Sequence, residues 1–134
     1  MNKGLVFVCF STDESFKQEF LGAHNQYRKQ HQAPELTYSD YTERITLKIF
    51  VVLYILGKEA VDSWYSEIKD YNFNTPGHQP KTGHFTQVVW KSSTELGVGL
   101  ATDGNTVYVV GQYKPAGNIT NAGYYEQNVL PKTE

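Results

Sequence analysis

The sequence predicts one domain that combines helices with a β-hairpin, of the α+β or layered α/β class. The prediction rests on two segments with a helical apolar stripe, an uninterrupted apolar run between them, and an Asp-Gly turn between two β-rich runs. A chain of 134 residues is the length of one domain and long enough to bury a core. With 40% hydrophobic and 19% charged residues, it is neither a disordered chain nor a coiled coil.

The first helix is predicted to begin near residue 12, where Ser11 and Glu14 have the spacing of a capping box. An apolar stripe follows at helical spacing: Phe16, Phe20, Ala23 and Tyr27. Polar side chains lie off the stripe: Lys17, Gln18, Arg28 and Lys29. Pro34 marks a boundary after this helix, because the residue before a proline avoids helical geometry.

The next apolar segment, Ile45–Leu56, differs from the helices around it. Its second half is continuously apolar and rich in β-branched residues, which favours a buried strand over a helix. This run is too short to span a membrane, and we expect a soluble protein.

A second helix is predicted for residues 58–69. Its buried stripe is formed by Ala60, Val61, Trp64 and Ile68. At 100° per residue, Glu67 lies beside Ala60 and Trp64, so it is the one acid of this helix that leans toward the core.

The second half of the chain alternates loops with short elements. Asp70–Gly83 is predicted to be a long loop, because it contains Pro76, Gly77 and Pro80. Residues 84–90 fit a short helix or a strand. Residues 97–102 and 106–113 are predicted strands, joined through Asp103-Gly104-Asn105 as a hairpin, and the remainder is predicted to be loop-like.

Residues 1–12 form a separate N-terminal segment, expected to be a short strand or an unstructured start. It lacks the small-residue cleavage site of a secretory signal. Its single cysteine, Cys9, excludes an intrachain disulfide framework and is expected to be an inert thiol.

Four ordered motifs resemble those of the CAP superfamily, which groups cysteine-rich secretory, antigen-5 and pathogenesis-related proteins. They are Ala23-His24-Asn25-Gln26-Tyr27-Arg28, Trp64-Tyr65-Ser66-Glu67-Ile68, Gly83-His84-Phe85-Thr86-Gln87-Val88-Val89-Trp90 and Tyr113-Lys114-Pro115-Ala116-Gly117-Asn118. The resemblance implies a CAP domain over residues 13–134 with an α-β-α sandwich fold. Residues 41–57 depart from the family, so the sandwich is shortened between the first and central helices.

The same resemblance implies a cavity lined by two histidines and two glutamates, which binds a divalent cation in some members. Only Glu67 and His84 match that set. A zinc site uses three or four protein ligands, so we expect no cofactor and at most weak zinc binding. Two other roles stay open: His84 as a buried residue that holds a backbone group, and Glu67 as an acid paired with a nearby donor such as a tyrosine hydroxyl.

Other polar residues are expected to have structural or solvated roles. His24 and Asn25 are expected to fix the first helix, and His78 is expected to be solvated. Asn118-Ile119-Thr120 is a glycosylation sequon that matters only in a secreted chain.

The resemblance implies a non-enzymatic domain that binds lipid or protein at a membrane surface. Self-association is expected through Ile45–Leu56, giving a homo-oligomer. No nucleic-acid partner is expected, since 12 basic residues against 14 acidic ones leave a net charge of −2. The resemblance also implies a cytoplasmic location at the Golgi membrane periphery, with an extracellular one as the alternative.

Two other functions stay open. The departure at residues 41–57 is consistent with a truncated or splice-variant domain with little activity. A metal-dependent hydrolase is the further alternative. A Ser-His-acid site could use Ser66 or Thr86 as the nucleophile with His84 and Glu67, although no nucleophile-elbow motif surrounds Thr86.

Overall fold

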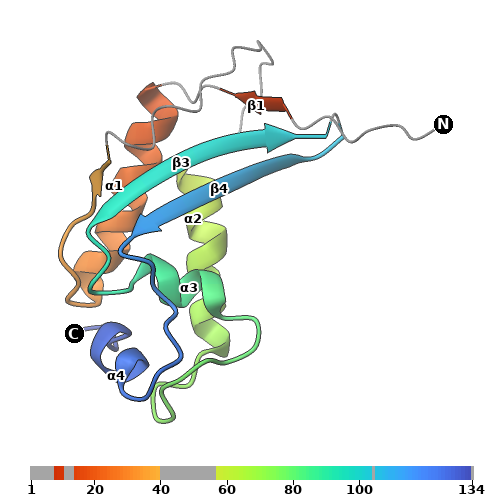
Figure 1. Ribbon diagram of the computed structural model, residues 1–134. Coiled ribbons are helices and arrows are strands. Elements are labelled where there is room, and N and C mark those ends of the chain that lie inside the picture. The colour runs from red at the N-terminus through yellow and green to blue at the C-terminus, as the bar shows by residue number, and fades with distance from the viewer. Residues whose placement is uncertain (1–7, 11–13, 40–56, 104, 134) are drawn as a thin grey trace.

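The computed structural model describes residues 8–10, 14–39, 57–103 and 105–133. It has the mixed α/β architecture that the sequence predicts, with a sheet backed by helices α1 and α2 and with α3 and α4 beyond the end of β4 (Figure 1). The predicted strand in Ile45–Leu56 lies outside the described residues. Of the departure at residues 41–57, only Gly57 is described. No helix in the described ranges is long and apolar enough to cross a membrane.

Helix α1, Glu14–Gln30, buries the predicted Phe16, Phe20 and Ala23, and Tyr27 is half-buried. The placement of Arg28 off the stripe was wrong: Arg28 is fully buried. Its burial is possible because backbone carbonyls surround its guanidinium group, which supplies the hydrogen bonds that water would otherwise make.

The second helix is divided into two parts. Helix α2, Gly57–Tyr65, continues as the 3-10 helix η2, Ser66–Asp70. Helix α2 crosses α1 closely at Gly57, where an added Cβ would lie 2.4 Å from the Phe16 carbonyl oxygen. A side chain at this position is therefore excluded by backbone atoms.

The predicted hairpin is confirmed as β3, Glu95–Thr102, and β4, Val107–Lys114. Asp103 fixes the turn, because its Oδ1 accepts the N–H groups of Asn105 and Thr106. Strand β3 lies inside the sheet: β1, Val8–Phe10, and the parallel β2, Thr37–Tyr38, pair with it on one side and β4 pairs on the other.

Two short helices complete the fold. Helix α3, Gly83–Val88, settles the helix-or-strand alternative for residues 84–90 in favour of a helix. Helix α4, Tyr124–Asn128, lies where the sequence predicted a loop. That prediction was wrong because a five-residue helix is too short to show a periodic pattern.

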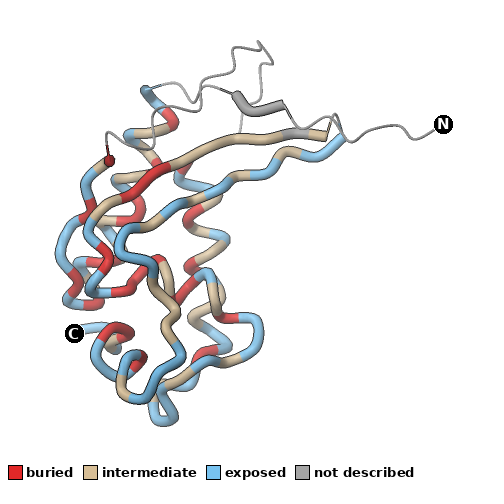
Figure 2. Tube along the Cα trace, in the orientation of Figure 1, coloured by how far each residue is buried: buried red, intermediate tan, exposed pale blue. Residues whose placement is uncertain are grey.

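The core lies between α1, α3 and the first half of β3 (Figure 2). Phe20, Phe85, Trp90 and Leu96 are fully buried there. Strand β4 alternates half-buried and exposed residues along its length, so one of its faces meets the helices and the other faces outward.

Candidate functional site

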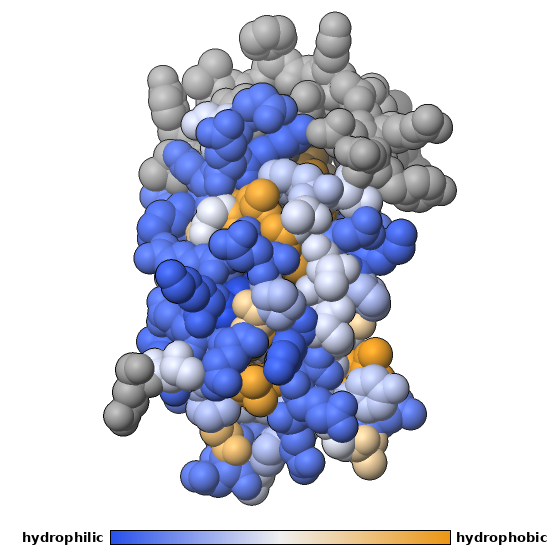
Figure 3. Space-filling model, turned by 90° about the vertical axis from the view of Figure 1, so that its left-hand side faces the viewer, coloured by the Kyte–Doolittle hydropathy of each residue, from blue (hydrophilic) through white to orange (hydrophobic). Residues whose placement is uncertain are grey.

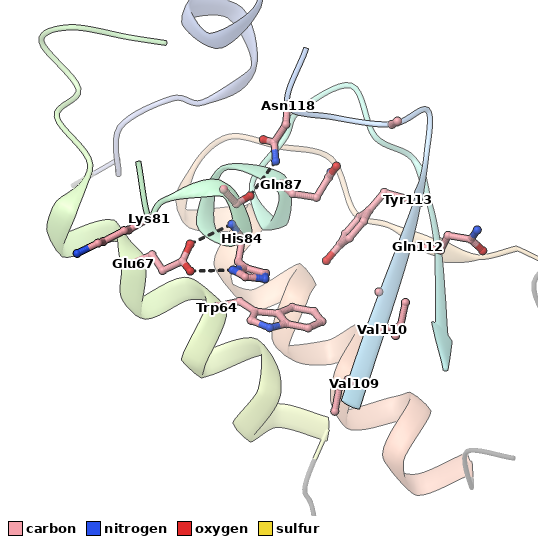
Figure 4. A pocket seen from close by; sticks show the side chains of 13 residues that line it. Trp64, Glu67, Lys81, His84, Gln87, Val109, Val110, Gln112, Tyr113 and Asn118 are labelled. Atoms are coloured by element: carbon pink, nitrogen blue, oxygen red, sulfur yellow. Dashed lines mark hydrogen bonds and ion pairs between the residues drawn. The ribbon is translucent and has the colours of Figure 1, made fainter. Parts of the chain in front are cut away.

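A pocket of about 730 Å³ opens between α2 and η2, α3 and the strand β4 (Figure 4). Trp64 and Val109 give it apolar walls, and its polar lining includes Glu67, His84 and Tyr113 beside Lys81, Gln87, Gln112 and Asn118. The pocket brings together the two residues that the sequence selected, Glu67 and His84, although they lie 17 positions apart. Figure 4 shows both on the side of the pocket opposite β4.

Glu67 holds the beginning of α3 in place. Its Oε2 accepts the backbone N–H groups of His84 and Phe85 at 2.9 and 3.1 Å, and its Oε1 accepts the His84 Nδ1 proton at 2.8 Å. The carboxylate therefore satisfies two N–H groups that a helix start leaves without intrahelical partners. The expectation of an acid paired with a nearby donor holds, but the donors are backbone amides and imidazole rather than a tyrosine hydroxyl.

His84 is exposed rather than buried, with 65% of its side chain accessible against 23% for Glu67. Its ring stacks on Trp64 with a centroid distance of 5.8 Å and an interplanar angle of 12°. Because Nδ1 donates to Glu67, the neutral ring has its free lone pair on Nε2. The alternative of a buried histidine that holds a backbone group was wrong, since the exposed ring is fixed by a carboxylate and an indole.

His24 sets the polarity of another wall of the pocket. Its Nδ1 lies 2.8 Å from the Phe20 carbonyl oxygen and its Nε2 lies 2.6 Å from Tyr113 Oη. A carbonyl only accepts, so Nδ1 carries the proton and Nε2 of the neutral ring accepts from Tyr113. Burial lowers the pKa of His24 to about 4, which keeps the ring neutral at pH 7.

The Tyr113 hydroxyl is consequently restricted to one role toward a ligand. Its proton is held by His24, so the oxygen presents only acceptor capacity to a group in the pocket. Burial also raises the pKa of Tyr113, so the phenol stays protonated. The sequence contained both residues within motifs but gave no signal that they are partners, because they lie 89 positions apart.

The donor set does not fit a tightly bound metal ion. Both oxygens of Glu67 and the Nδ1 atom of His84 are engaged with one another or with backbone amides, which leaves His84 Nε2 as the available ligand of this pair. No group of three or more histidine, cysteine or acidic side chains with metal-binding spacing occurs within the ranges that the structure describes. Weak zinc binding remains a prediction.

Neither candidate nucleophile is directed at His84. The Ser66 hydroxyl donates to the Ser63 carbonyl on an exposed surface, and the Thr86 hydroxyl donates to Asn118 Oδ1 at 2.6 Å. Asn118 also donates to the Gly83 carbonyl, so the asparagine of the sequon ties its loop to α3. A Ser-His-acid arrangement among these residues is therefore not formed.

Other predicted roles have clear outcomes. Asn25 both donates to and accepts from the backbone of Leu36, as expected of a residue that fixes the first helix. His31 is fully buried; its Nδ1 donates to the Leu130 carbonyl and its Nε2 accepts from Tyr65. His78 is exposed, in agreement with the prediction.

Arg28 is the residue whose role the sequence reasoning missed. Its guanidinium group donates at 2.7–3.4 Å to the backbone carbonyls of five residues: Pro34, Val88, Trp90, Lys91 and Ser93. Within the described residues, no carboxylate is bound to it. We call Arg28 and these carbonyls the Arg28 hub. Burial lowers the Arg28 pKa to about 10, so it is charged at neutral pH. Phe20, His24 and Arg28 follow one another at intervals of four residues, which places Arg28 on the same face of the helix as the buried Phe20. This spacing was the available signal of burial.

The comparisons with known proteins agree on one family. The model of the CAP, or cysteine-rich secretory protein, family matches residues 53–113. The human Golgi-associated plant pathogenesis-related protein 1 is 40% identical over an alignment of 149 residues, which covers 90% of this chain and 96% of that protein. The alignment is longer than this chain, so the human protein has residues that this chain lacks.

Two fungal relatives are longer than this chain. Protein PRY2 of Saccharomyces cerevisiae is 45% identical over 74 residues, covering 54% of this chain and 22% of that protein. The secreted protein RBT4 of Candida albicans is 32% identical over 148 residues, covering 88% of this chain and 41% of that protein. The chain thus spans less than half of either fungal relative.

Proposed function

Because the chain belongs to the cysteine-rich secretory protein (CAP) family, we propose that it is a non-enzymatic binding domain that takes up lipid at a membrane surface. The observation that carries this proposal is the pocket itself, which joins apolar walls to polar groups that are mostly engaged with the protein. Such a site suits an apolar ligand with a small polar end, since the walls bury its apolar part and few polar groups lose water.

The outer surface favours the pocket as the contact site. On the face shown in Figure 3, hydrophilic residues predominate and hydrophobic ones appear as small separate groups. A net charge of −2 gives no general attraction to acidic lipid. Lipid uptake through the pocket is therefore a better account than attachment by charge.

The test uses the two tryptophans of the chain, which lie in different surroundings. Trp64 lines the pocket, whereas Trp90 is fully buried in the core. Vesicles of phosphatidylcholine and phosphatidylserine with brominated acyl chains are expected to float with the protein and to quench the fluorescence of Trp64. The Trp64→Phe variant keeps an aromatic ring in the wall and is expected to float without quenching.

Two results would reject lipid uptake by the pocket. Flotation with equal quenching in wild type and Trp64→Phe would show contact elsewhere on the molecule. Absence of flotation at any salt concentration would instead favour the truncated or splice-variant domain with little activity. A cooperative melt by near-UV circular dichroism then tells whether that domain has a packed core.

Self-association is a second candidate, favoured by the outward face of β4. Tyr108 and Val110 point to the same side of the strand and are 44% and 53% exposed. Light scattering after size exclusion is expected to show a dimer that Val110→Lys converts to a monomer. An unchanged dimer would return attention to Ile45–Leu56, the contact expected from the sequence, which lies outside the described residues.

We propose the cellular location of this chain from the names of its relatives. The name of the human relative associates that protein with the Golgi, and we propose a cytoplasmic position at the Golgi membrane periphery for this chain. The fungal relative named as secreted supports the extracellular alternative. Cell fractionation, with protease protection of the Golgi fraction, distinguishes the two.

A further inference from the structure

The glycosylation sequon Asn118-Ile119-Thr120 is tied into the fold by its asparagine. Asn118 Nδ2 donates to the Gly83 carbonyl at 2.8 Å, and Asn118 Oδ1 accepts the Thr86 hydroxyl proton at 2.6 Å. Figure 4 shows the Asn118 side chain directed at the beginning of α3. Both ends of this side-chain amide are therefore held by one helix.

The backbone beside Asn118 is held as well. The Gly117 N–H donates to Gln87 Oε1 at 2.8 Å, and a Cβ at Gly117 would lie 2.7 Å from Trp90 Cγ. Ile119 is half-buried and packs against the hydrophobic core. Asn118 itself has a left-handed backbone with φ 57°, which asparagine adopts more readily than most residues. Its side chain can leave α3 only when this part of the loop opens.

N-glycosylation needs an asparagine amide that is free to change its geometry. The Nδ2 atom attacks C1 of the first sugar of an oligosaccharide diphospholipid, and the C1–O bond to the phosphate breaks. The diphospholipid leaves with the electron pair of that bond, and one Nδ2 proton goes to a base of the enzyme. Resonance with the carbonyl delocalises the lone pair of an amide nitrogen, so attack requires rotation out of the amide plane. A plane whose two ends are hydrogen-bonded to α3 resists this rotation.

We propose that Asn118 is an N-glycosylation site that folding closes. The unfolded chain presents the sequon as a flexible segment and accepts an oligosaccharide there. The folded chain accepts one only while the loop is locally open. Thr120 is exposed, so the closure depends on the asparagine of the sequon and not on its hydroxyl group.

The modification then depends on where the chain folds. A chain that enters the secretory pathway unfolded meets the glycosylating enzyme before the bond from Asn118 to Gly83 forms, whereas a chain that folds in the cytoplasm does not. A glycan on Asn118 therefore records passage of the unfolded chain through the secretory pathway. It would also stand in the wall of the pocket, which Asn118 lines.

The test compares two asparagines of the full chain in one reaction. Pro76→Thr creates a second sequon at Asn74, in an exposed part of the loop between η2 and α3. The folded variant is incubated with a purified oligosaccharyltransferase and an oligosaccharide diphospholipid, and mass spectrometry measures the occupancy of each asparagine over time. Asn74 is expected to be modified faster than Asn118 by about tenfold or more, because Asn118 reacts only in the locally open state.

Unfolding the same chain is expected to remove the difference. When the variant is diluted from urea into the reaction mixture, Asn118 is expected to gain glycan during refolding and to stop once near-UV circular dichroism shows a packed core. Thr86→Val removes the hydroxyl donor from a buried position and is expected to raise the rate at Asn118 severalfold in the folded chain. Thr120→Ala is the matched control, since it removes the sequon and leaves both bonds of Asn118 in place.

Two results would overturn the proposal. Equal rates at Asn74 and Asn118 in the folded chain would show that the bonds to α3 do not close the sequon. Modification of Asn74 without any glycan on Asn118 during refolding would show that Asn118 is not a site even in the unfolded chain. The comparison of the two asparagines decides the matter even if Thr86→Val fails to fold, and it does not depend on the lipid proposal.

Discussion

The Arg28 hub and the pocket use polar groups in opposite ways, although a residue of α1 is bonded within each: Arg28 in the hub, and His24 to Tyr113 of the pocket wall. In the hub, a fully buried guanidinium group donates to surrounding backbone carbonyls. In the pocket, the Tyr113 oxygen and His84 Nε2 keep acceptor capacity toward a ligand. Satisfied polar groups make a rigid support, whereas groups with remaining capacity next to open space make a binding site.

His24 connects the two regions. It lies one turn before Arg28 on α1 and accepts the proton of Tyr113, which lines the pocket. His24 therefore links α1 to the polar wall of the pocket through one hydrogen bond. The comparison predicts that changes in the hub cost stability and that changes in the pocket alter binding with little cost in stability.

The largest effect is expected from Arg28→Met. The substitution removes every donor of the hub and leaves buried carbonyls without partners, so the free energy of unfolding is expected to fall by about 3–5 kcal/mol. Urea denaturation measures the change. An unfolding midpoint equal to that of wild type would contradict the role of the hub.

Acid is expected to weaken the connection through His24. The folded pKa of about 4 lies below the unfolded value of 6.5, so the unfolded state binds more protons between these values. The free energy of unfolding therefore falls as pH decreases from about 6.5 to 4, by about 3 kcal/mol for His24. Burial also lowers the pKa of His31, which adds to the loss in the same direction.

Urea denaturation at pH 7 and pH 4 measures this dependence. The His24→Gln variant has no group to titrate at this position, so its loss of stability between the two pH values is expected to be smaller by that amount. Equal losses in wild type and variant would show that other groups cause the acid sensitivity.

Two glycine substitutions compare closed packing beside the buried Trp90 with the packing beside the pocket. In Gly117→Ala the new Cβ would lie 2.7 Å from Trp90 Cγ and from the Gln87 amide, so neighbours must move and about 2 kcal/mol is lost. In Gly111→Ala it would lie 3.2 Å from Trp64 and Tyr113, whose rings border the open pocket and have room to shift. The expected loss there is under about 1 kcal/mol. Equal losses in thermal or urea denaturation would remove the distinction between closed and open packing.

The smallest effects are expected within the acid–histidine pair. Glu67→Ala leaves the first amides of α3 without their acceptor and is expected to cost about 1 kcal/mol. His84→Ala removes an exposed ring and is expected to cost about 0.5 kcal/mol or less.

Calorimetric titration with zinc is expected to show no saturable site tighter than the high micromolar range, and tight binding that His84→Ala abolishes would contradict this.

The sequence identified the secondary elements where a pattern repeats several times. The stripe of α1 repeats over three turns and the Asp-Gly turn fixes the hairpin, and both predictions are confirmed. Glu67 was assigned an inward orientation from its position on a helical wheel, and it lines the pocket. Helix α4 was missed because five residues give no periodic signal.

Only the tertiary structure decided which polar groups are partners. His24 meets Tyr113 across 89 positions, and Arg28 reaches the Ser93 carbonyl across 65. Apolar periodicity records which side of an element is buried, because burial depends on the residue's own position along the helix or strand. The tautomer of His24 and the hydrogen-bond partners of Arg28 depend instead on donors and acceptors that distant segments bring near, and no spacing along the chain records them.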